Sequence, residues 1–145
     1  KYRLEAIKHK GVYVGINTSL PNGIIYEAIK EKKILNHLQG QIKKEVKYGK
    51  NSRVDIFIDN PKGKNCFIEV KSVTLSRLKG LSEFPDAKTT RGSKHLIELT
   101  EMSKQGNECY LVYLIQRKDV EMFSIAKDID EEYYKNSIIA KNIEK

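Results

Sequence analysis

Two acidic residues and a lysine, Asp55, Glu69 and Lys71, lie on the two arms of one predicted β-hairpin. Its turn is marked by Asn, Pro, Lys and Gly at residues 60–63, where chain reversal costs little. If the hairpin folds at Lys62, Asp55 faces Glu69 across the ribbon, and Lys71 projects on the same side. Like charges directly opposite each other destabilise a sheet. We therefore infer that the two carboxylates share a function, and their oxygens suit Mg²⁺ or Mn²⁺.

The predicted chemistry is metal-assisted attack on phosphorus. In this interpretation Asp55 and Glu69 hold Mg²⁺ or Mn²⁺, and the backbone carbonyl of Val70 is a third ligand. The ammonium of Lys71 orients or deprotonates a water and stabilises developing negative charge. Glu27, on the first predicted helix, is expected to close the metal site from above.

Two plainer alternatives stay open. The first is a solvated salt-bridge network, in which three basic residues neutralise the two acids without any metal. These basic residues are Arg53, Lys47 and Lys71. The second concerns Glu27 and Glu45, which are ordinary solvated glutamates if they do not approach the site.

The strands around the site sort their residues by face. One face of the hairpin is apolar, as a core face should be. Its predicted facing pairs are Val54 with Val70, Ile56 with Ile68, and Ile58 with Cys66. The alternating segment before it, residues 42–48, turns at Gly49 and places Val46 beside Val54 and Glu45 beside Asp55. On the charged face, Phe57 and Phe67 either stack on bases or lie under a helix.

The remaining pattern predicts an α/β fold, with a mixed central sheet flanked by helices. Short strands are expected near residues 1–7 and 11–16, and a helix over residues 21–32. An irregular loop is expected over residues 73–89, followed by a helix that Thr89 or Thr90 caps and Gly106 ends. The apolar run 109–116 is typical of a strand buried on both faces. Residues 128–141 predict a last helix, so helices are expected on both faces of the sheet.

Several polar residues outside the hairpin have two interpretations each. His95 and Glu98 lie three apart on the second long helix, a spacing that suits a metal site as well as a hydrogen-bonded histidine. Residues 89–91 either cap this helix or contact phosphate. Gln116 ends the apolar strand, where it either reaches the edge of the site or makes a terminal hydrogen bond.

Charge and composition favour a nucleic-acid partner. The chain has 145 residues, with 27 Lys and Arg against 19 Asp and Glu, and a net charge of +8. This length suits one core, and the excess of base favours a polyanionic partner, nucleic acid first and a membrane surface second. No apolar run is long enough to span a bilayer and no signal-peptide pattern occurs, which predicts a cytoplasmic protein without a membrane partner. The two cysteines are expected to be buried thiols in a reducing compartment. The basic residues expected to grip DNA are Arg53, Lys47, Lys50, Arg77, Lys79 and Arg91.

Four stretches of the sequence together resemble the sugar fermentation stimulation protein family. They are residues 14–22, 45–55, 67–75 and 84–96. The resemblance implies a prokaryotic, cytoplasmic protein that binds DNA without sequence preference, on a restriction-endonuclease-like fold of the PD-(D/E)xK class. Asp55, Glu69 and Lys71 fall on the nuclease motif, and Glu27 falls on its first-helix acidic position. Val54 stands where the name of the motif has proline.

The resemblance also implies a domain organisation. Members of this family carry an OB-like domain ahead of the nuclease-like one. Residues 1–10 are therefore expected to be the remnant of that upstream domain, and residues 11–145 the nuclease-like domain.

Three functions compete. The first is a non-specific DNA-binding protein that cleaves phosphodiesters with a divalent metal. The second is a catalytically inactive DNA-binding regulator on the same scaffold, whose affinity still falls steeply with salt. The third is a protein-interaction module, against which the basic residues argue.

Overall fold

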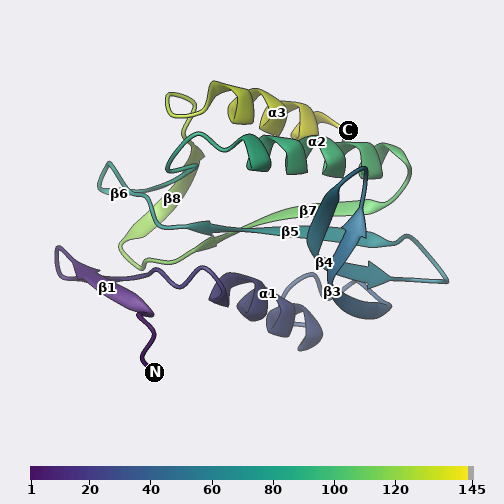
Figure 1. The fold of residues 1–145 in the computed structure, drawn as a ribbon, viewed down its shortest axis with the longest axis horizontal. Helices are drawn as coiled ribbons and strands as arrows, with labels where there is room; N and C mark the ends of the chain where they lie inside the picture. The colour runs from purple at the N-terminus through teal and green to yellow at the C-terminus, as the bar shows by residue number, and fades with distance from the viewer. Residues whose placement is uncertain (144–145) are drawn as a thin grey trace.

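The computed structural model describes residues 1–143 and is organised around a four-stranded mixed sheet (Figure 1). The strand order is β3-β4-β5-β7, with the first three strands antiparallel and β7 parallel to β5. The mixed central sheet of the prediction is therefore confirmed. β7 lies at the edge of this sheet with half-buried side chains, so the expectation of burial on both faces is wrong. The strands are β3 (Gln41–Tyr48), β4 (Ser52–Asp59), β5 (Cys66–Val73) and β7 (Glu108–Ile115).

Two short sheets flank the central one. β1 (Ala6–His9) and β2 (Val12–Gly15) form an antiparallel pair. β6 (Gly80–Phe84) and β8 (Val120–Ile125) form a parallel pair. The expectation of an irregular loop over residues 73–89 is wrong, because β6 forms within it. A five-residue strand has too little pattern to show in the sequence, and its partner comes much later in the chain.

Helices α2 and α3 follow local signals at their ends. Thr89 caps α2 by accepting the backbone N–H of Gly92 at 3.0 Å, as predicted. Gly106 follows α2 with φ of +92°, a left-handed conformation that often ends helices. Asp130 caps α3 by accepting the backbone N–H of Tyr133 at 2.9 Å. The helices are α1 (Leu20–Lys30), α2 (Thr90–Lys104) and α3 (Glu131–Asn142).

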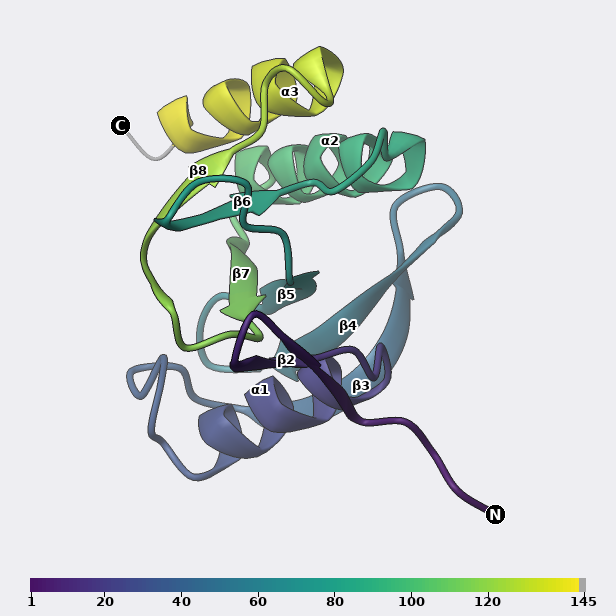
Figure 2. The same ribbon diagram turned by 90° about the vertical axis from the view of Figure 1, so that its left-hand side faces the viewer.

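The helices cover both faces of the central sheet. α1 lies on one face, α2 lies on the other, and α3 lies outside α2 (Figures 1 and 2). The core beneath α1 includes Ile25, Ile29 and Ile68, and the core beneath α2 includes Phe67 and Leu99. Phe57 lies against Phe67, with ring centroids 4.9 Å apart. The two phenylalanines therefore pack under a helix and do not present a surface for base stacking.

The ribbon of β3 and β4 changes face at Glu45. Ile42 and Ile56 pack on the α1 side, whereas Val46 and Val54 pack on the α2 side. Glu45 is exposed between them and has φ of +52°, a left-handed angle that interrupts the alternation of side chains along a strand. The predicted pairing of Val46 with Val54 is confirmed. The predicted continuous apolar face is wrong, because nothing in the alternating sequence reveals this backbone angle.

Candidate metal centre

β4 and β5 separate at the level of Asp55. The predicted register is confirmed over three pairs, which are Ile58–Cys66, Phe57–Phe67 and Ile56–Ile68. Beyond Ile56 these two strands, both fully described, form no further pair. The sequence predicted that Asp55 faces Glu69 across a continuous ladder. This prediction is wrong, because the ladder ends at Ile56 and Ile68. The end of the ladder releases the backbone N–H of Val70 for a bond to a side chain.

The half-buried Asp55 carboxylate takes up this N–H. Its Oδ2 accepts from the backbone nitrogen of Val70 at 2.8 Å, and its Oδ1 accepts from Asn22 Nδ2 at 2.7 Å. Burial raises the pKa of Asp55, the negative charge of Glu69 raises it further, and the two hydrogen bonds only partly oppose this. The two acids therefore lie close enough to repel each other. A bound divalent cation relieves such repulsion.

Glu69 is 2% exposed and uses its two carboxylate oxygens differently. Its Oε1 contacts Lys71 Nζ at 2.8 Å and also His95 Nδ1. Burial acts to raise the pKa of Glu69, but the His95 hydrogen bond and the Lys71 charge outweigh it and hold the pKa below its ordinary value. Its Oε2 is buried and has no hydrogen-bond partner within residues 1–143. An ionised oxygen in this condition is costly unless a cation or water binds it.

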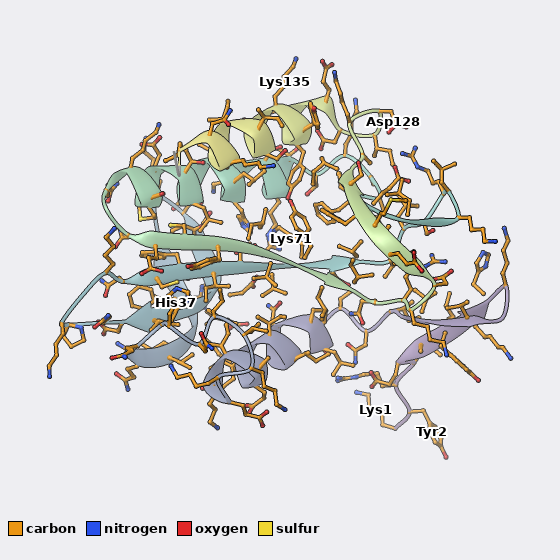
Figure 3. The ribbon with its side chains drawn as sticks, turned by 180° about the vertical axis from the view of Figure 1, so that it is seen from behind. Lys1, Tyr2, His37, Lys71, Asp128 and Lys135 are labelled. Atoms are coloured by element: carbon orange, nitrogen blue, oxygen red, sulfur yellow. The ribbon has the colours of Figure 1, made fainter. Side chains whose placement is uncertain are left out.

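Lys71 lies between the sheet and α2 (Figure 3). Its ammonium is 2.8 Å from Glu69 Oε1 and 3.3 Å from His95 Nδ1. Of the three bases in the salt-bridge alternative, Lys71 alone pairs with an acid of the site. Arg53 and Lys47 are exposed, face each other across β3 and β4, and form no ion pair in the described part of the chain. The salt-bridge network is thus reduced to one buried pair.

Asn22 is the residue of α1 that reaches the site, through its hydrogen bond to Asp55. Glu27 is exposed, and its carboxylate lies 3.9 Å from Lys30 Nζ. Glu27 lies five positions after Asn22, which turns the two side chains roughly 140° apart on an α-helix. Asn22 continues the buried stripe of Ile25 and Ile29 at helical spacing. The structure therefore does not bring Glu27 to the metal ligands, and a polar residue on an apolar stripe is the signal that identifies Asn22.

His95 and Glu98 of α2 both approach the sheet. His95 is 5% exposed and contacts Glu69, so the interpretation as a hydrogen-bonded histidine is confirmed. The carboxyl group of Glu98 lies beside the β3–β4 turn, 3.1 Å from where a Cβ on Gly49 would lie. Across residues 1–143, no cluster of three or more His, Cys, Asp or Glu side chains is arranged to hold a metal ion. The candidate centre is a carboxylate pair, of the kind that Mg²⁺ completes with waters and phosphate oxygens.

Arg77 is committed to the protein itself. Its guanidinium donates to both oxygens of Glu83, at 2.8 and 2.7 Å, and to Asp128 Oδ1 at 2.9 Å. These hydrogen bonds raise the pKa of Arg77 and join the start of β6 to the segment before α3. The predicted contact of Arg77 with DNA is therefore not supported, because its donors are already occupied.

The remaining predicted DNA contacts are exposed, whereas the start of α2 and Gln116 make hydrogen bonds within the protein. Lys50, Lys79 and Arg91 are exposed. At the start of α2, Thr89 serves as a cap, and its own backbone N–H is taken by Asp130 Oδ2 at 2.8 Å. The capping interpretation of this segment is confirmed. Gln116 Nε2 donates to the hydroxyl of Ser72 at 3.3 Å. Ser72 follows Lys71 in β5, so Gln116 makes a hydrogen bond beside the site and does not contact the carboxylates.

The fold and the site define a class: an α/β domain with one buried and one half-buried carboxylate where two strands of a mixed sheet separate. Residues 19–143 match the family model described as the sugar fermentation stimulation protein RE domain, SfsA. The chain therefore belongs to the sugar fermentation stimulation protein (SfsA) family, and the resemblance in its sequence is confirmed. No helix among residues 1–143 has the length and apolar character needed to cross a membrane.

Relatives and a solved structure agree with this assignment. The chain is 45% identical to the homologue from Rhizobium meliloti over 92% of its length, and 46% identical to that from Pelagibacter ubique over 97%. It covers 57% and 61% of those proteins. A structure described as Pyrococcus furiosus SfsA in complex with Ca²⁺ is similar over 97% of this chain and 60% of that one, with a TM-score of 0.82 and 29% identity. The chain thus spans less than two thirds of the relatives it matches.

Proposed function

We propose that this protein binds DNA without sequence preference and cleaves phosphodiesters with Mg²⁺ or Mn²⁺ held by Asp55 and Glu69. The observation that carries the proposal is the buried, unpartnered Oε2 of Glu69 beside a second carboxylate whose pKa is raised by burial and by Glu69. Two acids in this state fit an oxygen-preferring cation. The Ca²⁺ named for the Pyrococcus furiosus relative, another oxygen-preferring ion, supports the same choice.

The protein's own groups prepare the site for such an ion. Val70 and Asn22 fix the two oxygens of Asp55, and His95 together with Lys71 fixes Oε1 of Glu69. This arrangement leaves Glu69 Oε2 without a protein partner among residues 1–143, and each oxygen of Asp55 keeps a second lone pair for a ligand. A metal bound there supplies a polarised phosphoryl oxygen and a more acidic water.

Lys71 is the group that acts on the reacting atoms. Its ammonium forms a buried ion pair with Glu69. Away from bulk water, a positive charge more strongly stabilises the negative charge that develops on phosphorus. It also donates a hydrogen bond that can orient a water toward phosphorus. His95, at 3.3 Å from the ammonium, restricts where Lys71 can point.

The DNA contact is assigned to the end of the β3–β4 ribbon nearest Asp55. Lys47 and Arg53 lie directly opposite each other there, a placement of like charges that costs stability and that a phosphate between them offsets. At the other end of the ribbon the cations are engaged within the protein. Lys43 is paired with Asp59 at 2.6 Å, and the ammonium of Lys44 lies 4.0 Å from the ring of Tyr26. Lys50, Lys79 and Arg91 extend the exposed basic surface.

Binding without cleavage is the second candidate. The observation that favours it is the Lys71–Glu69 ion pair. In the cleavage proposal Lys71 orients the attacking water, and this ion pair already engages its ammonium. Both functions share the DNA surface and differ in the metal-dependent step.

Cleavage of plasmid and single-stranded DNA with Mn²⁺ separates the two candidates. Asp55→Ala is expected to abolish cleavage and to preserve most DNA binding. Glu27→Ala is the matched control, because it removes an acid of α1 that lies away from the site, and it is expected to cleave like the wild type. If the purified wild type leaves all DNA and RNA substrates intact with both Mg²⁺ and Mn²⁺, the catalytic proposal fails and binding alone remains.

A further inference from the structure

Three buried oxygens on the α2 side of the sheet have no hydrogen-bond partner within the described residues. They are the hydroxyl of Tyr48, Oε2 of Glu69 and Oε2 of Glu98, and Ser93 Oγ near the start of α2 is a further buried oxygen in the same state. The three come from β3, β5 and α2, so no single element explains their state. Tyr48 and Glu69 are 8% and 2% exposed, which rules out direct hydration from bulk solvent.

The contacts of these residues bring them to one place. His95 on α2 bonds to Glu69, and Glu98 follows His95 by about one helical turn on the same face. The Glu98 carboxyl lies beside Gly49, the neighbour of Tyr48. The ring of Tyr48 lies 5.5 Å from the ring of Phe67. Phe67 precedes Glu69 by two residues and therefore lies on the same face of β5. Burial raises the pKa of Tyr48, and the negative charges of Glu69 and Glu98 raise it further, which agrees with this placement.

The charges around this point do not balance. Asp55 and Glu69 act on each other electrostatically, and Glu69 and Glu98 both act on the hydroxyl of Tyr48. The cationic partner of Glu69 is Lys71, with His95 also touching Glu69. Within residues 1–143 the ion pairs of this region all involve Glu69, and Asp55 accepts hydrogen bonds from uncharged groups only. Buried negative charge without a counter-ion is costly.

We propose that Glu69 and Glu98, with the hydroxyl of Tyr48 as a neutral ligand, hold a second divalent cation next to the one assigned to Asp55 and Glu69. This inference rests on the proposed function, because Glu69 is shared by both positions. A carboxylate oxygen has lone pairs for two partners. Glu98 is only half-buried, so water can reach this position and complete the coordination of a hard cation.

Titration of the full chain with Mn²⁺, followed by electron paramagnetic resonance, tests the proposal. The wild type is expected to bind about two ions per chain close enough to couple magnetically, which broadens the spectrum. Glu98→Gln is expected to bind about one ion with an uncoupled spectrum. The matched control is Glu101→Gln, which changes an exposed acid of the same helix that pairs with Lys104, and it should behave like the wild type.

A milder variant guards against misfolding. Tyr48→Phe keeps the ring and removes only the unpartnered hydroxyl, and it is expected to weaken the second ion several-fold without affecting the first. A wild type that binds a single uncoupled ion, lost in Asp55→Ala and kept in Glu98→Gln, overturns the second position and leaves the proposed function standing. Coupled ions that persist in Glu98→Gln also overturn it. A wild type that binds no Mn²⁺ defeats both proposals.

Discussion

The carboxylate of Asp55 accepts the backbone N–H of Val70 at 2.8 Å, at the level where their strands have ceased to pair. In a continuous hairpin that N–H would face the neighbouring strand or solvent. Its capture by a side chain holds Asp55 next to Glu69 across the point of separation. A site that depends on two acids is therefore positioned by a defect in the sheet, and the helices on either face supply the remaining contacts, Asn22 from α1 and His95 from α2.

His95 is expected to position Glu69 for metal binding. His95→Ala should weaken Mn²⁺ binding roughly 10-fold or more, since partners that orient a metal ligand typically contribute this much. His95→Asn keeps an N–H donor near the place of Nδ1 and should retain most of the affinity. Isothermal titration calorimetry measures both, with His37→Ala, a surface histidine next to Tyr110, as the control. Equal losses in the Ala and Asn variants would show that orientation by a hydrogen bond is not the cause.

Metal affinity is expected to fall in acid because of Asp55. Its pKa is raised above the ordinary 3.8 by burial and by Glu69, so it takes up a proton at a higher pH than a free aspartate does. Glu69, whose pKa is lowered despite its burial, stays ionised over the same range. Protons therefore compete with Mn²⁺ at Asp55 first. The affinity for Mn²⁺, measured by calorimetry at several pH values above 3.8, should decline as the pH falls. An affinity that stays constant down to pH 3.8 contradicts the assignment of Asp55 as a metal ligand.

The same shift has a consequence for stability without metal. A raised carboxyl pKa means that the folded state holds the proton more tightly than the unfolded state. The contribution of Asp55 to stability is therefore present at low pH and is lost as the pH rises from 3.8 through the folded pKa. The stabilisation by Mn²⁺, read as the increase in melting temperature, should accordingly be larger at neutral pH than near pH 4. An equal increase at both values argues against a metal on Asp55.

Lys47 and Arg53 are expected to contribute to DNA binding through phosphates. Each single Ala substitution should weaken binding to all sequences about equally and lower the slope of log affinity against log salt by roughly 1. Fluorescence anisotropy at several salt concentrations gives this slope. Lys43→Ala is the matched control on the same ribbon, because Lys43 is already paired with Asp59. An unchanged slope in both Lys47 and Arg53 variants would remove the ribbon from the DNA surface.

Arg77 is expected to matter for stability and not for DNA. Arg77→Ala removes the bonds to Glu83 and Asp128 and leaves Glu83, 7% exposed, without its counter-ion. The melting temperature should fall by several degrees, while affinity for DNA stays within two-fold of the wild type, roughly the range of a surface change. Lys79→Ala, at an exposed neighbouring position, should leave the melting temperature unchanged. A large loss of DNA affinity in folded Arg77→Ala would restore its predicted role.

The local sequence accounts for the parts of the site that one hairpin contains. The turn at residues 60–63 and a side-chain period of two are short-range properties, so they are enough to place Asp55, Glu69 and Lys71 together and to give the register through Ile56 and Ile68. The cap of α2 at Thr89 is predictable for the same reason. The family likewise follows from the residues themselves, since its motifs lie in continuous stretches.

Tertiary packing decided the rest. Asn22, and not Glu27, meets Asp55 because the buried stripe of α1 sets how that helix faces the sheet. His95 meets Glu69 because α2 lies across the opposite face. The helical spacing of Asn22 with Ile25 and Ile29 can be read from the sequence, but how α1 and α2 dock on the sheet depends on contacts between residues far apart in the chain. The alternation of polar and apolar residues could specify which side chains share a strand face, but only the docking of two helices determines which of them surround the carboxylates.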